Sequence, residues 1–144
     1  MHTASMHSEV SASAILPLLM LLVMASALFA GQPQEIPKDS ALRTELFDLA
    51  RPAVEEQAGR PVKFHGSLKK LDDWAFFKGE IVDTKGRPIL LHEVGSAEAC
   101  ILWKRSKGGW KVLRAFAGIT DVAWEPWPEE FGAPPELLGV QDLR

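Results

Sequence analysis

Few side chains in the sequence have the chemistry of a general acid, a general base or a nucleophile. After residue 30 the chain contains two histidines, His65 and His92, one cysteine and no tyrosine. An imidazole with an ordinary pKa of about 6.5 acts as a general base when a carboxylate orients it, and His65 with Glu80 or Asp121 is the best such pair. An exposed strand histidine beside a solvated acid is the commoner arrangement, and the pattern favours that interpretation.

The single cysteine, Cys100, indicates neither a catalytic nucleophile nor a disulfide. It falls in an apolar run that is typical of a buried strand, where a thiol behaves as a small hydrophobic side chain. His92, Glu93 and Cys100 carry metal-binding atoms, but their spacing matches no zinc motif and adjacent residues point in different directions. We therefore expect no metal and no cofactor.

The first thirty residues form an apolar segment that is distinct from the rest of the chain. No charged residue occurs from Val10 to Ala30, and the small residues Ala25-Ser26-Ala27 satisfy the small-x-small rule for signal-peptide cleavage. No lysine or arginine precedes this segment, and it is long enough to span a membrane, so an uncleaved anchor is the alternative. Both interpretations place the remaining chain outside the cytoplasm. A cleaved segment predicts a bacterial periplasmic or secreted protein, and an uncleaved one predicts a membrane-anchored protein.

One amphipathic helix is predicted early in the mature chain. Apolar residues recur at helical spacing over about residues 40–58, with charged residues on the other side. Asp39 or Ser40 can cap its beginning, and Gly59 can end it. Pro52 lies inside the pattern and removes one backbone hydrogen bond, so we expect a kink there.

Four runs with strand-like sequence follow the helix. They alternate apolar and polar residues or are continuously apolar, and turn-forming residues separate them. They cover residues 62–69, 74–82, 97–105 and 110–119. One helix followed by antiparallel strands predicts an α+β fold in which a curved sheet of about four strands packs on the helix. We expect one domain over residues 40–144, preceded by an extended linker at residues 31–39.

The alternation of side chains assigns each strand residue to one of two sheet faces. The face toward the helix is expected to carry Val62, Phe64, Leu68, Ala75, Phe77, Ile81, Ile101, Trp103, Leu113, Ala115, Ala117 and Ile119. The opposite face is expected to carry charged residues together with Trp74, Phe76, Trp110, Arg114 and Phe116. A face that mixes so many aromatic side chains with charges is a candidate binding surface.

Charge is divided unevenly between the sheet and the irregular tail at residues 120–144. Residues 61–119 carry a net charge of +5, whereas the tail carries −5 and contains two tryptophans and four prolines. An acidic, tryptophan-containing tail after a basic, aromatic sheet predicts that the tail folds back over the sheet. We expect the tail to bury Val122, Trp124, Trp127 and Phe131 against the aromatic face.

The hairpin entry Lys107-Gly108-Gly109-Trp110-Lys111-Val112-Leu113, after a helix and a meander, resembles the cystatin-like α+β superfamily that includes the nuclear-transport-factor-like domains. The stretches Asp73-Trp74-Ala75-Phe76 and Gly118 to Trp124 are similar to uncharacterised secreted bacterial proteins of that type. The resemblance implies an architecture and no activity, because this fold hosts enzymes, binding modules and scaffolds. The Gln-x-Val-x-Gly loop of the cystatin inhibitors is absent, so protease inhibition is not implied.

These patterns favour an exported, non-enzymatic binding or accessory domain. Its aromatic face would bind a partner protein, a small apolar ligand or a second copy of the chain. The net charge of −3 excludes a strongly basic nucleic-acid-binding protein, and membrane contact is expected only if the N-terminal segment stays uncleaved. The alternative is a small acid–base enzyme of the lyase or isomerase kind that uses His65.

Overall fold

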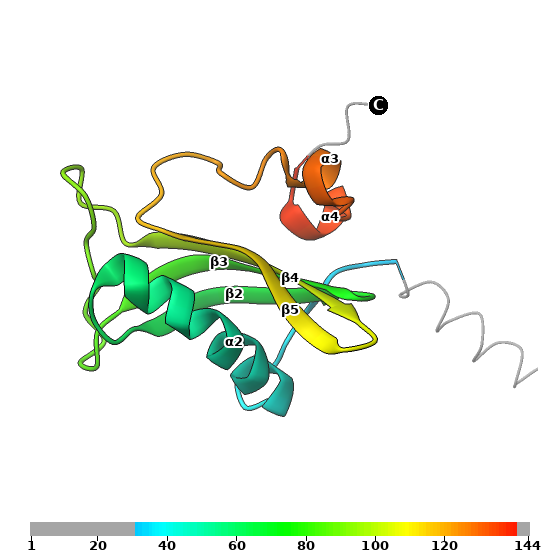
Figure 1. The fold of residues 1–144 in the computed structure, drawn as a ribbon, viewed down its shortest axis with the longest axis horizontal. Helices are drawn as coiled ribbons and strands as arrows, with labels where there is room; N and C mark the ends of the chain where they lie inside the picture. The colour runs from blue at the N-terminus through cyan, green and yellow to red at the C-terminus, as the bar shows by residue number, and fades with distance from the viewer. Residues whose placement is uncertain (1–30, 141–144) are drawn as a thin grey trace, which may run out of the picture. The chain divides into compact units, whose positions relative to one another are not determined.

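The computed structural model describes residues 31–140. The predicted export segment, residues 1–30, and the end of the predicted tail, residues 141–144, lie outside the described residues. The elements in chain order are β1 (Gln34–Glu35), α2 (Ala41–Ala58), β2 (Lys63–Leu71), β3 (Trp74–Val82), β4 (Glu98–Ser106), β5 (Gly109–Ala117), α3 (Trp127–Phe131) and α4 (Pro135–Leu138). One long helix packs on an antiparallel sheet, which confirms the α+β prediction (Figure 1).

The sheet has five strands in the order β1-β2-β3-β4-β5, one more than expected. The additional strand, β1, lies within the predicted linker and pairs with Lys69 and Lys70 of β2. Ile36 follows it, donates its backbone N–H to the Leu68 carbonyl at 2.8 Å and buries its side chain. Two paired residues are too few to produce an alternating pattern, so the sequence carries no strand signal there.

Helix α2 begins and ends at the capping residues that its sequence predicts. Ser40 has an extended backbone, and its hydroxyl accepts a hydrogen bond from the Leu42 N–H at 3.1 Å. Gly59 adopts the left-handed conformation with φ +70° and donates to the Glu55 carbonyl at 2.7 Å. Pro52 lies inside the helix, and the kink that we expect there stays a prediction.

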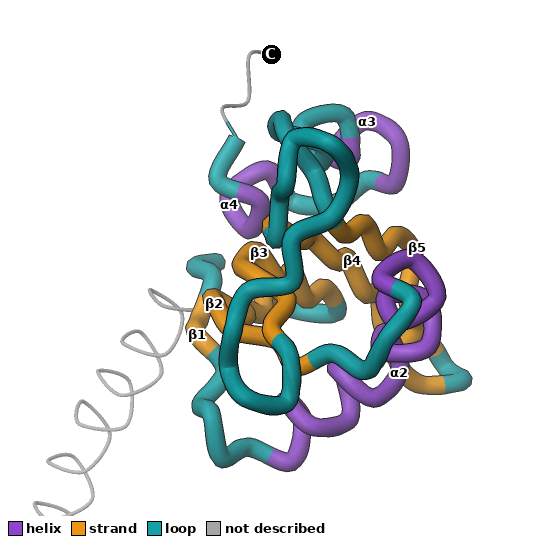
Figure 2. Tube along the Cα trace, turned by 90° about the vertical axis from the view of Figure 1, so that its left-hand side faces the viewer, coloured by secondary structure: helices purple, strands orange, loops and turns teal. Residues whose placement is uncertain are grey.

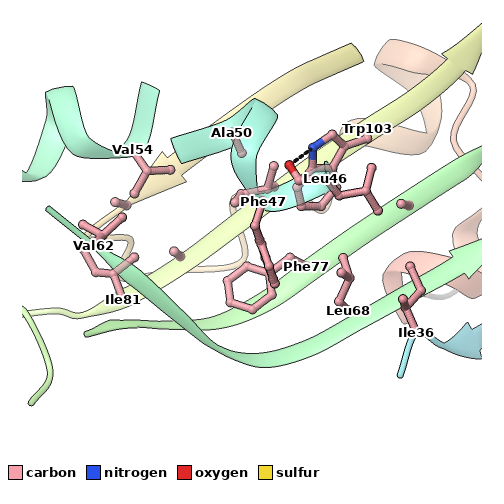
Figure 3. Packing of buried hydrophobic residues seen from close by; sticks show 14 of the residues in the cluster. Ile36, Leu46, Phe47, Ala50, Val54, Val62, Leu68, Phe77, Ile81 and Trp103 are labelled. Atoms are coloured by element: carbon pink, nitrogen blue, oxygen red, sulfur yellow. Dashed lines mark hydrogen bonds between the residues drawn. The ribbon is translucent and has the colours of Figure 1, made fainter. Parts of the chain in front are cut away.

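The larger hydrophobic cluster lies between α2 and one face of the sheet, which we call the helix face. Phe47 of α2 stacks on Phe64 with ring centroids 4.5 Å apart and meets the edge of Phe77 at 5.2 Å. Trp103 is fully buried, and its indole N–H donates to the Leu46 carbonyl at 2.9 Å (Figure 3). This bond satisfies the one polar group of the indole inside the core.

A second hydrophobic cluster lies on the opposite face of the sheet, the tail face. Residues 119–140, which we call the C-terminal segment, cover this face and include α3 and α4, so the sheet is sandwiched between α2 and the C-terminal segment (Figure 2). The cluster is built from Leu71, Phe76, Cys100, Leu102, Trp124, Trp127, Ala133, Leu137 and Leu138. The tail therefore folds back as its charge and tryptophan content predict, although Val122 stays 50% exposed.

A β-bulge in β5 changes the predicted alternation of its side chains. The register shifts between Leu102 and Trp103 of β4, which leaves Leu113 without a partner. The predictions that Leu113 lies on the helix face and Trp110 on the tail face are wrong, because Trp110 packs in the helix-side cluster and Leu113 in the tail-side cluster. Ile119, also expected on the helix face, packs with the tail-side cluster, because β5 ends two residues before it.

Candidate functional site

A groove of about 1660 Å³ lies between the tail face of the sheet and the C-terminal segment. Strands β2, β3 and β4 supply its floor, and residues from Ile119 to Val140 supply its wall. Phe76 on the floor and Trp124 on the wall are in contact, with ring centroids 6.0 Å apart. The fold-back of the C-terminal segment therefore creates the groove and also gives it an aromatic pair in its lining.

Eight charged side chains line the groove, six acidic and two basic. They are Glu80, Glu98, Asp121, Glu125, Glu129, Glu136, Lys69 and Lys78. None of them belongs to an ion pair between described residues. Charges that are not paired within the protein are free to interact with a ligand, and the excess of carboxylates favours a cationic one.

Lys78 is held against an aromatic ring of the groove lining. Its ammonium nitrogen lies 4.7 Å from the centroid of the Trp124 ring, which is a cation–π distance. Trp124 itself is buried, so the lysine covers an indole that is already fixed in place. The indole of Trp124 therefore already accommodates a cation in this groove.

Two carboxylates stand directly opposite each other on the groove floor. Glu80 of β3 pairs in register with Glu98 of β4, and on its other side with His65 of β2. Like charges at directly opposed positions destabilise a sheet. Residues that violate a folding rule without a compensating contact are expected at functional sites, and this pair marks the floor as a candidate.

The structure places His65 directly opposite Glu80 on neighbouring strands, but only two of the three residues of the predicted acid–base site line the groove. Glu80 and Asp121 both line the groove, whereas His65 is exposed and is not among the lining residues. No hydrogen bond or ion pair between described residues joins His65 to either acid. The two acids thus lie in the groove, with His65 beside it.

Cys100 is fully buried in the tail-side cluster. Burial raises the pKa of its thiol to about 12, and the negative charge of Asp121 adds to this effect. At neutral pH the side chain is therefore a protonated thiol, which is a poor nucleophile. The arrangement agrees with the interpretation of Cys100 as a small hydrophobic side chain.

The predicted binding face is mostly occupied by the protein itself. Phe76 is 5% exposed beneath the C-terminal segment, and Trp74 is half-buried with the Lys104 ammonium 4.6 Å from its ring centroid. Arg114 donates to the Glu130 carboxylate at 2.8 Å. Of the five predicted residues Trp110 lies on the other face, whereas Arg114 and Phe116, the latter 39% exposed, remain accessible to solvent.

Apart from Asp121, the groove acids of the C-terminal segment were not singled out as site residues from the sequence. Glu125, Glu129 and Glu136 line the wall, and each lies within two residues of a proline in the irregular tail. The only sequence signal for them is the net charge of −5 after residue 119. That charge predicts a contact with the basic sheet, but it does not predict which acids line a groove.

The part of the chain that the structure describes contains no group of three His, Cys, Asp or Glu side chains placed to hold a metal ion. Within the same residues, no helix is both long enough and apolar enough to cross a membrane.

Comparisons with known proteins give no information on the function of the chain. No protein-family model, no curated protein and no solved structure matches the chain. The resemblance to the cystatin-like superfamily accordingly stays a prediction.

Proposed function

We propose that the protein is an exported, non-enzymatic binding domain whose groove receives a segment of a partner protein or a ligand with apolar and cationic groups. The observation that carries this proposal is the groove itself, which is lined by six carboxylates that form no ion pair with described residues and by the contacting rings of Phe76 and Trp124. Aromatic rings supply apolar contact area, and the carboxylates supply charge complementarity for a cation.

The acid–base enzyme using His65 has weaker support. A general base must lie within hydrogen-bond reach of a bound substrate, and His65 does not line the groove that contains Glu80 and Asp121. The thiol of Cys100 is buried and protonated, so it offers no alternative nucleophile. A binding role needs neither group.

The proposal also includes a location and an architecture. The uncharged sequence from Val10 to Ala30, with its small residues before Gly31, supports export from the cytoplasm. A long helix packed on an antiparallel sheet supports a cystatin-like arrangement.

A peptide titration tests the groove. An alternating arginine–leucine octapeptide is expected to change the tryptophan fluorescence of the protein, because Trp124 lies in the groove, and a glutamate–leucine octapeptide is not. Replacing both floor acids, Glu80→Gln with Glu98→Gln, is expected to weaken binding of the cationic peptide roughly fivefold.

The matched control replaces two exposed acids of α2, Glu45→Gln with Glu56→Gln, and should leave the affinity unchanged. Equal binding of both peptides, or equal weakening by the two pairs of substitutions, would contradict a groove that selects cationic ligands.

A further inference from the structure

The outer edges of β2 and β5 differ in how many of their outward backbone groups are already hydrogen-bonded. The outer edge of β5 is covered by the side chain of Gln57 from α2, whose amide donates to the Ala115 carbonyl at 2.8 Å and accepts from the Ala117 N–H at 2.9 Å. This amide makes the two hydrogen bonds that another strand would make. Part of the β5 edge is therefore closed to strand addition.

The outer edge of β2 is closed only at its ends. Near one end, the Leu68 carbonyl accepts from the Ile36 N–H at 2.8 Å, and the Leu68 N–H donates to the Glu35 carboxylate at 3.1 Å. Just before the other end, the Val62 N–H donates to the Glu55 carboxylate at 3.2 Å and the Val62 carbonyl accepts from Arg51 at 3.4 Å.

Two residues between these ends keep their backbone groups free. Since Leu68 points its N–H and carbonyl outward, the alternation of a strand directs those of Gly66 and Phe64 outward as well. No described residue bonds to these four groups. β1 does not extend along them, because the chain turns away after Ile36, where the Pro37 carbonyl accepts from the Ser40 N–H at 3.1 Å.

The side chains beside this open edge differ between its two faces, and the basic ones lie on the tail face. Lys63 and His65 are exposed on the tail face. On the helix face Phe64 is half-buried, and the guanidinium of Arg51, 5.7 Å from its ring centroid, is already paired with the Asp48 carboxylate. A strand added here would direct alternate side chains toward these two sets of groups, so acidic side chains mixed with apolar ones fit the edge.

We propose that the β2 edge from Lys63 to Gly66 docks an extended acidic segment of a partner protein, which joins the sheet as an antiparallel strand. A second copy of the chain fits less well, because two antiparallel β2 edges would bring basic side chains of both copies together. None of the residues from Lys63 to Gly66 lines the groove, so this surface is separate from the groove.

Amide hydrogen exchange tests the docked strand at the two backbone groups that define it. The probe is an alternating glutamate–valine octapeptide, added to 15N-labelled protein at ten times its Kd. Exchange at the Phe64 and Gly66 amides is expected to slow about tenfold, while His65, whose amide already points toward β3, changes little. A lysine–valine octapeptide should give no protection.

The variant Lys63→Glu removes a basic side chain without touching the backbone, and it should abolish the protection. Lys107→Glu, which makes the same change at an exposed turn, should preserve it. Gly66 is unsuitable for substitution, because an added Cβ would lie 2.6 Å from the Gly79 Cα.

Three outcomes would overturn the proposal: no protection by the glutamate–valine peptide, protection that Lys63→Glu leaves intact, or protection without any peptide in a dimer seen by sedimentation. The last would identify a second copy as the occupant. Binding in the groove is measured by tryptophan fluorescence, and binding at the β2 edge is measured by amide exchange. Failure of one proposal can therefore be told apart from failure of the other.

Discussion

Asp83 holds the turn that follows β3. Its carboxylate accepts the backbone N–H groups of Lys85 and Arg87, both at 2.9 Å, and the Arg87 side chain at 3.2 Å. Hydrogen bonding from the Arg87 amide is the main cause that lowers the pKa of Asp83, and it outweighs the opposing effect of burial. Asp83 is the one buried charged side chain within residues 31–140, and its ionised form stabilises the folded protein.

We expect Asp83 to make the stability of the protein depend on pH in the acid range. Because its folded pKa lies below its unfolded pKa of about 3.9, the stabilisation is complete above pH 3.9 and is lost as the pH falls through the folded value. Asp83→Asn should lower the urea midpoint at pH 7, and the difference from the unmodified protein should shrink below pH 3.9. A difference that stays constant with pH would contradict this role, and the exposed Glu93→Gln serves as the control.

Gln57 is the clearest case in which an element protects its neighbour. Helix α2 packs along β5, and this packing places the Gln57 amide against the free edge of that strand. The side chain is exposed, so its hydrogen bonds compete with water and contribute modestly to stability. Its larger contribution is to occupy the backbone groups of Ala115 and Ala117.

Gln57→Ala is expected to lower the free energy of unfolding by about 1 kcal/mol and to increase self-association through the β5 edge. Urea unfolding measures the first effect, and sedimentation velocity over a range of protein concentrations measures the second. Glu56→Ala, at the neighbouring exposed position, should change neither. A Gln57→Ala protein that stays monomeric at all concentrations would show that the edge needs no such protection.

The accuracy of the sequence predictions follows the length of the pattern in each element. Helix α2 has five turns of apolar spacing with a cap at each end, and β3 has nine residues, so both were predicted closely. Strand β1 has two residues, and the bulge at Leu113 involves neither glycine nor proline, so neither feature leaves a recognisable signal. Trp110 was assigned to the wrong face for that reason.

The two faces of the sheet are covered by parts of the chain that differ in charge and regularity. Helix α2 covers one face through regular apolar spacing, and the C-terminal segment covers the other through separate anchors, chiefly Trp124 and Trp127. Net charge and aromatic content indicated this second contact from the sequence. The groove was not predictable, because it depends on how an irregular segment arches over the sheet, which no periodic pattern encodes.

Trp127 is the anchor of the C-terminal segment whose loss should lower the free energy of unfolding most. It is 2% exposed, and its ring centroid lies 6.1 Å from those of both Phe76 and Phe116. Trp127→Ala is expected to lower the free energy of unfolding by about 3–5 kcal/mol, a large part of the about 5–15 kcal/mol that stabilises a typical domain. Urea unfolding followed by circular dichroism measures this loss.

Deleting residues 120–144 removes every anchor of the C-terminal segment and should give an insoluble or unfolded product, because Leu71, Phe76 and Leu102 would then face water. Val122→Ala is the control for Trp127→Ala, since Val122 belongs to the same segment but is half exposed, and its stability should stay within about 0.5 kcal/mol of the unmodified protein. If the truncated protein unfolds at an unchanged temperature, or Trp127→Ala behaves like Val122→Ala, the C-terminal segment is an addition to a sheet that is stable on its own. The C-terminal segment that bounds the groove would then be only loosely held, and part of the binding free energy of a ligand would be used to order it.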